Sequence, residues 1–170
     1  MTLPGIFGSE GETHEHGSVE SIDSLNDAVN QLKQIYGSDR INIGAVSASG
    51  TTVSALLTKR QDINNMILGS TMFNEKEYMK NQKWSTDYLG FKNPYSPIDH
   101  VDEIKSDSDR NILIISDPRD RVVPNIYSRQ FARALKDSHI NVTLKEVSID
   151  TKDHHETTMW VITRLIQSSR

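Results

Sequence analysis

A run of four apolar residues, Ile-Leu-Ile-Ile at 112–115, lies between Asn111 and Ser116 and limits the possible folds more than any other segment. An unbroken apolar run bounded by turn residues is typical of a parallel strand covered on both faces, because a strand with one wet face would alternate. Three further segments are predicted as strands. They are residues 41–46, 65–69 and 142–149.

Helical patterns separate these strands. Apolar residues recur at three- and four-residue spacing over 22–35, with Ser21 or Ser24 available as the cap and Gly37 as the stop. Residues 1–20 have no apolar period and are predicted as loop. Further helices are predicted over 51–59, 125–136 and 157–167. This alternation predicts the α/β class: one domain over 1–170, with three layers (α/β/α) and a mostly parallel sheet of about four strands.

Composition excludes some classes of function. The chain has 170 residues, a net charge of −4, no dense basic run and no cysteine. We therefore expect no nucleic-acid partner, no disulfide and no thiolate metal site. No apolar stretch approaches the roughly 20 residues that span a bilayer, and the N-terminus does not resemble a signal peptide, so we expect a cytoplasmic protein without a membrane contact. The His-Glu-His segment at 14–16 lacks a diagnostic ligand spacing, so we expect neither metal nor cofactor.

In parallel sheets, function collects at the carboxyl ends of the strands. The first such end is Ala-Val-Ser-Ala-Ser-Gly at 45–50. A nucleophile elbow needs a serine on a sharp strand-to-helix turn with small residues two before and two after it, which here are Ala45 and Ser49 around Ser47. The N–H of Ala48 would then be an oxyanion donor. The alternative is an ordinary turn in which Ser49 caps the next helix.

Two more strand ends carry candidate chemistry. Asp117 and Asp120 follow the apolar strand, and either is placed to orient a histidine, although Asp-Pro and Pro124 also suit a plain turn. His154 and His155 follow the last strand, where an imidazole could act as a general base or could be a solvated loop side chain. The sequence thus offers serine, acid and histidine in that order.

Four segments resemble bacterial α/β-hydrolases of the prolyl oligopeptidase and dienelactone hydrolase group. They are Pro-Gly-Ile-Phe-Gly-Ser-Glu-Gly at 4–11, Pro-Tyr-Ser-Pro-Ile-Asp-His-Val at 94–101, Ser-Asp-Pro-Arg-Asp-Arg-Val-Val at 116–123 and Asp-His-His at 153–155. The resemblance implies a partial α/β-hydrolase fold, with Ser47 as nucleophile, Asp120 as triad acid and one of the two histidines as base. Position beside the predicted helix favours His155, and His154 remains open.

The resemblance also implies what the chain lacks. In that family the loop resembling residues 4–11 follows several strands, one of which leads to the second oxyanion donor. We therefore expect the chain to begin partway through the family's domain. A sheet cut on one side exposes an edge, which a second copy of the chain would cover.

The leading hypothesis is a serine hydrolase acting on an ester or amide of a small molecule or peptide. One alternative is a non-catalytic domain of the same fold with a binding or assembly role, and another is a flavodoxin-like module with a phosphate at residues 47–52. Residues 71–108 hold most of the aromatic side chains. They suit either a cap over the site or ordinary buried packing.

Overall fold

The computed structural model describes residues 18–82 and 95–168. Its centre is a four-stranded sheet of β1 (Ile41–Val46), β2 (Ile63–Gly69), β3 (Asn111–Ser116) and β4 (Val142–Glu146). The strands lie in the order β1-β2-β3-β4 and every neighbouring pair is parallel. The predicted four-stranded parallel sheet is thereby confirmed.

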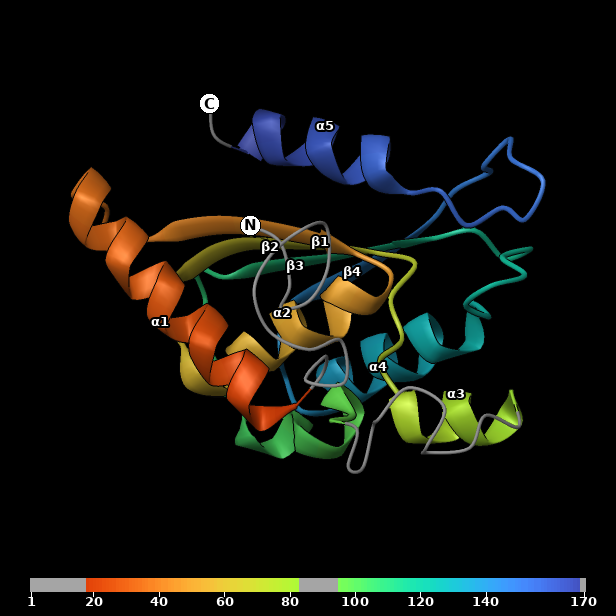
Figure 1. The fold of residues 1–170 in the computed structure, drawn as a ribbon, viewed down its shortest axis with the longest axis horizontal. Helices are drawn as coiled ribbons and strands as arrows, with labels where there is room; N and C mark the ends of the chain where they lie inside the picture. The colour runs from red at the N-terminus through yellow and green to blue at the C-terminus, as the bar shows by residue number, and fades with distance from the viewer. Residues whose placement is uncertain (1–17, 83–94, 169–170) are drawn as a thin grey trace.

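Helices cover both faces of the sheet (Figure 1). One face carries α1 (Val19–Tyr36), α2 (Ala48–Lys59), α4 (Ile126–Asp137) and the 3₁₀ segment η2 (Pro97–Glu103), and the other carries α5 (Thr158–Ser168). The larger core lies under the first group, where Leu56, Met66 and Phe131 are fully buried. A smaller core joins Ile67 and Ile115 to Val161 of α5. The predicted three-layer arrangement is confirmed.

Some element ends differ from those predicted. The cap of α1 is Ser18, whose hydroxyl accepts the N–H of Ser21 at 3.1 Å, and not Ser21 or Ser24. Ser21 is buried in the first turn, so the helix starts earlier than its apolar period suggests. Gly37 does end this helix, with the left-handed φ of 60° that favours glycine.

β4 is also shorter than predicted, because it ends at Glu146. Its last ladder partner is Ser116, the final residue of β3, and the N–H of Val147 closes the pairing by donating to the Ser116 carbonyl. Val147 and Ile149 remain buried, so their apolar character reflects core packing beyond the sheet. Both residues are buried although they lie beyond the last ladder pair, and this explains why the predicted strand is longer than β4.

Part of the aromatic segment 71–108 packs in the interior. Phe73 stacks on Phe131 with ring centroids 4.4 Å apart, and Tyr78 of α3 (Glu75–Asn81) meets Tyr127 edge-on at 5.9 Å. Buried packing therefore accounts for these two rings. Residues 83–94, the middle of the segment in which a cap is predicted, lie outside the described residues. Across the ranges 18–82 and 95–168, no helix is long and apolar enough to cross a membrane.

Candidate active site

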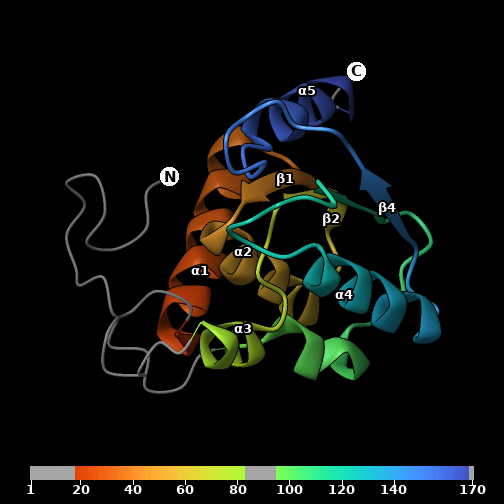
Figure 2. The same cartoon turned by 90° about the vertical axis from the view of Figure 1, so that its right-hand side faces the viewer.

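The carboxyl ends of the four strands meet at one edge of the sheet, on the right of Figure 1 and facing the viewer in Figure 2. Ser47 follows β1, Asp120 follows β3 and His155 follows β4. Three residues separated by up to 108 positions are thus brought to one place. This is the edge at which the topology of parallel sheets puts functional groups.

Ser47 occupies a strained turn between β1 and α2. Its backbone has φ 56° and ψ −132°, a combination that L-residues rarely adopt and that costs on the order of 1–3 kcal/mol. Small neighbours are needed here because a Cβ on Gly50 would lie 2.0 Å from the hydroxyl of Thr71. The geometry has the features of a nucleophile elbow: a strand, a strained serine and then a helix.

The alternative in which Ser49 caps α2 is wrong. The cap position belongs to Ser47, whose side chain makes no capping hydrogen bond. The hydroxyl of Ser49 instead donates to the carbonyl of Val46 at 2.7 Å and accepts from the N–H of the same residue at 3.3 Å. Ser49 therefore stabilises the turn through its bonds to Val46. The Ser47 hydroxyl makes no capping bond to the helix and can contact a group outside it.

His155 bridges the serine and the acid. Its Nε2 lies 2.9 Å from the Oγ of Ser47, and its Nδ1 lies 2.9 Å from the Oδ2 of Asp120. An ionised carboxylate only accepts hydrogen bonds, so Nδ1–H donates to Asp120 and Nε2 can accept the proton of the Ser47 hydroxyl. The imidazole is 17% exposed and the Asp120 carboxylate is fully buried. The hydrogen bond to Asp120 raises the pKa of His155, although burial acts in the opposite direction.

Asp120 is held from both sides. Its Oδ1 accepts the N–H groups of Val122 and Val123, each at 2.9 Å, and its own N–H donates to the carbonyl of Asp117 at 3.0 Å. Only Oδ2 is left to face His155. Asp117, the other candidate acid, bonds Arg119 and the N–H of Ile149 and lies 3.8 Å from Nδ1 of His154, so Asp120 and not Asp117 meets His155.

The two histidines have different surroundings. His154 has a left-handed φ of 58°, and its Nδ1 donates to the carbonyl of Ile149 at 2.6 Å. The bonds to Ser47 and Asp120 are both made by His155. The sequence leaves this choice open, and the structure favours His155 by its two hydrogen bonds.

The remaining predicted site residue is Ala48, the first residue of α2. The N–H groups of a helix's first turn have no acceptor within the helix, so the Ala48 N–H is free of the helical ladder beside Ser47. Among residues 18–82 and 95–168, no group of three or more His, Asp or Glu side chains could hold a metal. The His-Glu-His segment at 14–16 lies outside the described residues.

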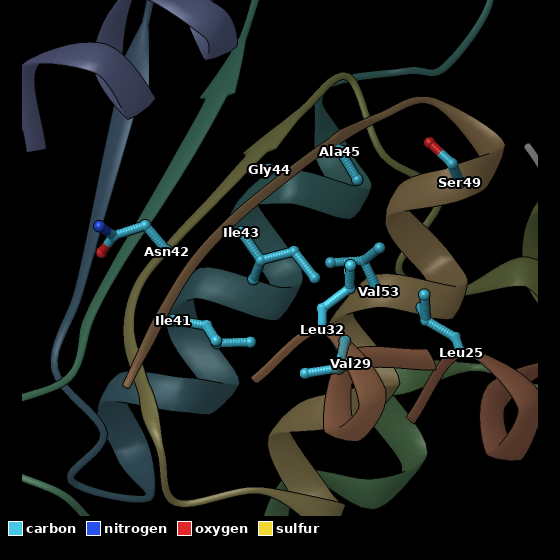
Figure 3. A pocket seen from close by; sticks show the side chains of 10 residues that line it. All are labelled: Leu25, Val29, Leu32, Ile41, Asn42, Ile43, Gly44, Ala45, Ser49 and Val53. Carbon is cyan, nitrogen blue, oxygen red and sulfur yellow. The ribbon is translucent and has the colours of Figure 1, made fainter. Parts of the chain in front are cut away.

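A groove of about 340 Å³ runs beside the elbow along the outer edge of β1 (Figure 3). Leu25, Val29 and Leu32 of α1 line it on one side, and Ser49 and Val53 of α2 also line it. Ser47 does not line this groove. The groove reaches Ser49, two positions from Ser47, and lies on the side where, in the described part of the sheet, β1 has no further strand beside it.

Comparison with known proteins supports the fold and leaves the chemistry open. No protein-family model and no curated protein matches the chain. Among solved structures, the acylaminoacyl peptidase of Pyrococcus horikoshii matches 95% of the chain with a TM-score of 0.69 at 18% identity. An esterase of Pyrococcus furiosus matches 95% with a TM-score of 0.67 at 18% identity. The carboxylesterase of Bacillus cereus matches 89% with a TM-score of 0.56 at 15% identity.

The chain spans only part of each of these proteins. It covers 30% of the Pyrococcus horikoshii peptidase, 64% of the Pyrococcus furiosus esterase and 60% of the Bacillus cereus enzyme. At such low identity the likeness establishes the fold alone. The chain therefore has a partial α/β-hydrolase fold, which it shares with these peptidases and esterases.

Proposed function

We propose that the chain is a serine hydrolase that cleaves an ester or amide bond through Ser47, His155 and Asp120. The observation that carries the proposal is the single imidazole that meets the Ser47 hydroxyl and the Asp120 carboxylate at 2.9 Å each. Packing of a loop histidine does not by itself require its ring to bond both a strained serine and a buried acid. This arrangement matches the geometry and the roles by which a catalytic triad is identified.

The proposed reaction begins with attack of Ser47 Oγ on the substrate carbonyl while His155 Nε2 takes the hydroxyl proton. The carbonyl oxygen becomes an oxyanion, which the Ala48 N–H would contact. His155 then returns its proton to the departing alcohol or amine, leaving an acyl group on Ser47. Water, deprotonated by the same histidine, releases the acid and restores the serine.

Asp120 stays ionised throughout this cycle. It fixes the Nδ1–H tautomer of His155 and stabilises the imidazolium that forms in each half of the reaction. The raised pKa of His155 has the same cause, because the hydrogen-bonded carboxylate favours the charged ring. The proposed chemistry draws only on side-chain and backbone groups of the chain and on water.

The proposed substrates are esters or amides of small molecules or peptides. Structures with this fold include proteins named as an esterase and as an acylaminoacyl peptidase, so the fold accommodates both leaving groups. Cytoplasmic location and a cap formed within residues 71–108 remain predictions. A second copy of the chain over the edge of β1 also remains a prediction, which sedimentation of the purified protein would test.

Turnover of p-nitrophenyl acetate, p-nitrophenyl butyrate and an aminoacyl p-nitroanilide tests the proposal. We expect hydrolysis that falls by about a thousandfold or more in Ser47→Ala, because the nucleophile is lost. Ser54→Ala is a matched control within α2, since the Ser54 hydroxyl donates to the local carbonyl of Thr51. Folded protein without turnover, or equal turnover in Ser47→Ala, would favour the non-catalytic alternative.

A further inference from the structure

Two loops meet beside the triad-like cluster. The acid loop (117–124) follows β3, and the histidine loop (147–157) follows β4. A single backbone bond joins their middles, since the N–H of Arg121 donates to the carbonyl of Asp153 at 2.9 Å. The distance between Asp120 and His155 depends on how firmly these loops are held together.

Asp117 is a buried ionic link between them. Its carboxylate is fully buried, and Oδ2 accepts the N–H of Ile149 in the histidine loop at 2.6 Å. Arg119 supplies the balancing charge through Nη2 to Oδ2 at 2.8 Å and Nε to Oδ1 at 3.1 Å. These charge-assisted bonds hold the pKa of Asp117 well below its usual range, the Arg119 bond being the largest cause.

Arg119 also reaches across to the histidine loop. Its Nη2 donates to the Oγ of Ser148 at 2.7 Å, although the Arg119 side chain is half exposed. The planar guanidinium can hold Asp117 and Ser148 at once because its donors are fixed in a fork. The Asp117–Arg119 pair therefore contacts the histidine loop at the Ile149 N–H, the Ser148 hydroxyl and the Ile149 carbonyl, the last at 3.5 Å from Nη2.

Hydrogen bonds connect Asp117 to both the acid and the histidine of the proposed triad. The Asp117 carbonyl accepts the N–H of Asp120, which fixes the acid. Ile149, held by the Asp117 carboxylate, accepts the Nδ1–H of His154 at 2.6 Å, and His154 directly precedes His155. Asp120 and His155 are thus linked in two ways. One is their own hydrogen bond, and the other is the chain of hydrogen bonds that runs through Asp117.

We propose that Asp117 and Arg119 form a positioning pair that fixes the histidine loop against the acid loop and so sets the contact between Asp120 and His155. Its effect on catalysis rests on the proposed function, whereas its effect on the His155–Asp120 bond does not. Neither residue would touch the substrate in this role. The pair differs from a surface ion pair because its carboxylate is wholly buried.

The test is the pKa of His155, measured by NMR titration of the imidazole in the wild-type protein and in Arg119→Gln. The charged and titratable groups that act on this ring are Asp120, Asp153 and Glu156. Loosening the loops weakens the bond to Asp120, so the pKa of His155 should fall by about half a pH unit or more. If Arg119 acted only through its charge, removal of that cation would raise the pKa of His155. The two explanations therefore predict opposite signs.

Arg121→Gln is the matched control, because it removes a cation two positions along the same loop and keeps the backbone bond to Asp153. We expect no fall in the pKa of His155 in this variant. A fall in Arg119→Gln alone supports the positioning pair. An unchanged or raised value in Arg119→Gln, or an equal fall in both variants, overturns it.

Kinetics provide a second readout that separates the two proposals. In an active enzyme, Arg119→Gln should lower kcat about tenfold with little change in KM, since misplacement of catalytic groups acts on the chemical step. In an Asp120→Asn background the same change should have almost no further effect on kcat. Additive losses would overturn the positioning role. Absence of any turnover contradicts the proposed function, and the NMR result still decides the positioning pair.

Discussion

Glu75 is a buried acid whose effect on stability can be worked out from the structure. It is the first residue of α3 and is 4% exposed, and within the described residues its Oε2 has no hydrogen-bond partner. Burial raises its pKa from 4.5 to about 7, because the charged form loses its hydration. The perturbation is Glu75→Gln, which keeps the shape of the side chain and removes the charge.

The direction in which the stability changes with pH follows from proton binding. Because its pKa is higher in the folded protein, Glu75 binds more protons folded than unfolded between pH 4.5 and about 7. The contribution of Glu75 to stability is therefore present at low pH and is lost as the pH rises through the pKa of Glu75 in the folded protein. The shift corresponds to about 3 kcal/mol in all, of which roughly 2.5 kcal/mol falls between pH 5 and pH 8.

Urea unfolding followed by circular dichroism at pH 5 and pH 8 measures this difference. A buried amide has its own cost, but that cost is the same at both pH values, so only the change between them is compared. We expect the stability of Glu75→Gln relative to wild type to improve by roughly 2.5 kcal/mol from pH 5 to pH 8. Glu20→Gln, at an exposed position of α1, should shift by no more than about 0.5 kcal/mol. A shift at Glu75 no larger than that of this control would refute the reasoning.

Three further predictions concern the site. Asp120→Asn should lower kcat by about 10⁴-fold, because the amide favours the wrong tautomer of His155; a loss under tenfold in steady-state kinetics would contradict its role. The pH profile of kcat/KM should have an acid limb centred above pH 6.5, because His155 must be neutral to act as base and its pKa is raised; a limb below that value would count against it. Gly50→Ala should cost about 1–3 kcal/mol in urea unfolding, because the added Cβ meets Thr71 at 2.0 Å, and an unchanged midpoint would disprove the close approach.

Much of the fold could be predicted because its signals are local. The apolar run 112–115 matches β3, and Gly37 ends α1 with the expected positive φ. At the end of β4 the prediction failed because a neighbour distant in sequence decided the outcome. β4 stops at Glu146 because its partner β3 ends at Ser116, although the apolar pattern continues to Ile149.

The sequence predicts which strand ends carry the candidate site, but it does not predict the individual hydrogen bonds within the site. Parallel topology brings Ser47, Asp120 and His155 to one edge, and their order along the chain suggested this grouping. The choice of His155 over His154 rests on the hydrogen bonds of His155 to Asp120 and Ser47, which two adjacent identical residues cannot reveal. The sequence also suggests Asp117 as a candidate acid, but its contact with Ile149, 32 positions away, has no sequence signal.

Reaction with a fluorophosphonate probe tests whether Ser47 is the nucleophile, because the probe bonds covalently to an activated serine and requires no knowledge of the substrate. Intact-mass measurement and peptide mapping should find one adduct, on Ser47, in the folded wild-type protein. Ser47→Ala should stay unlabelled, and Ser54→Ala should label as wild type does. Folded wild-type protein that stays unlabelled, or equal labelling of Ser47→Ala, would contradict the assignment of Ser47 as the nucleophile.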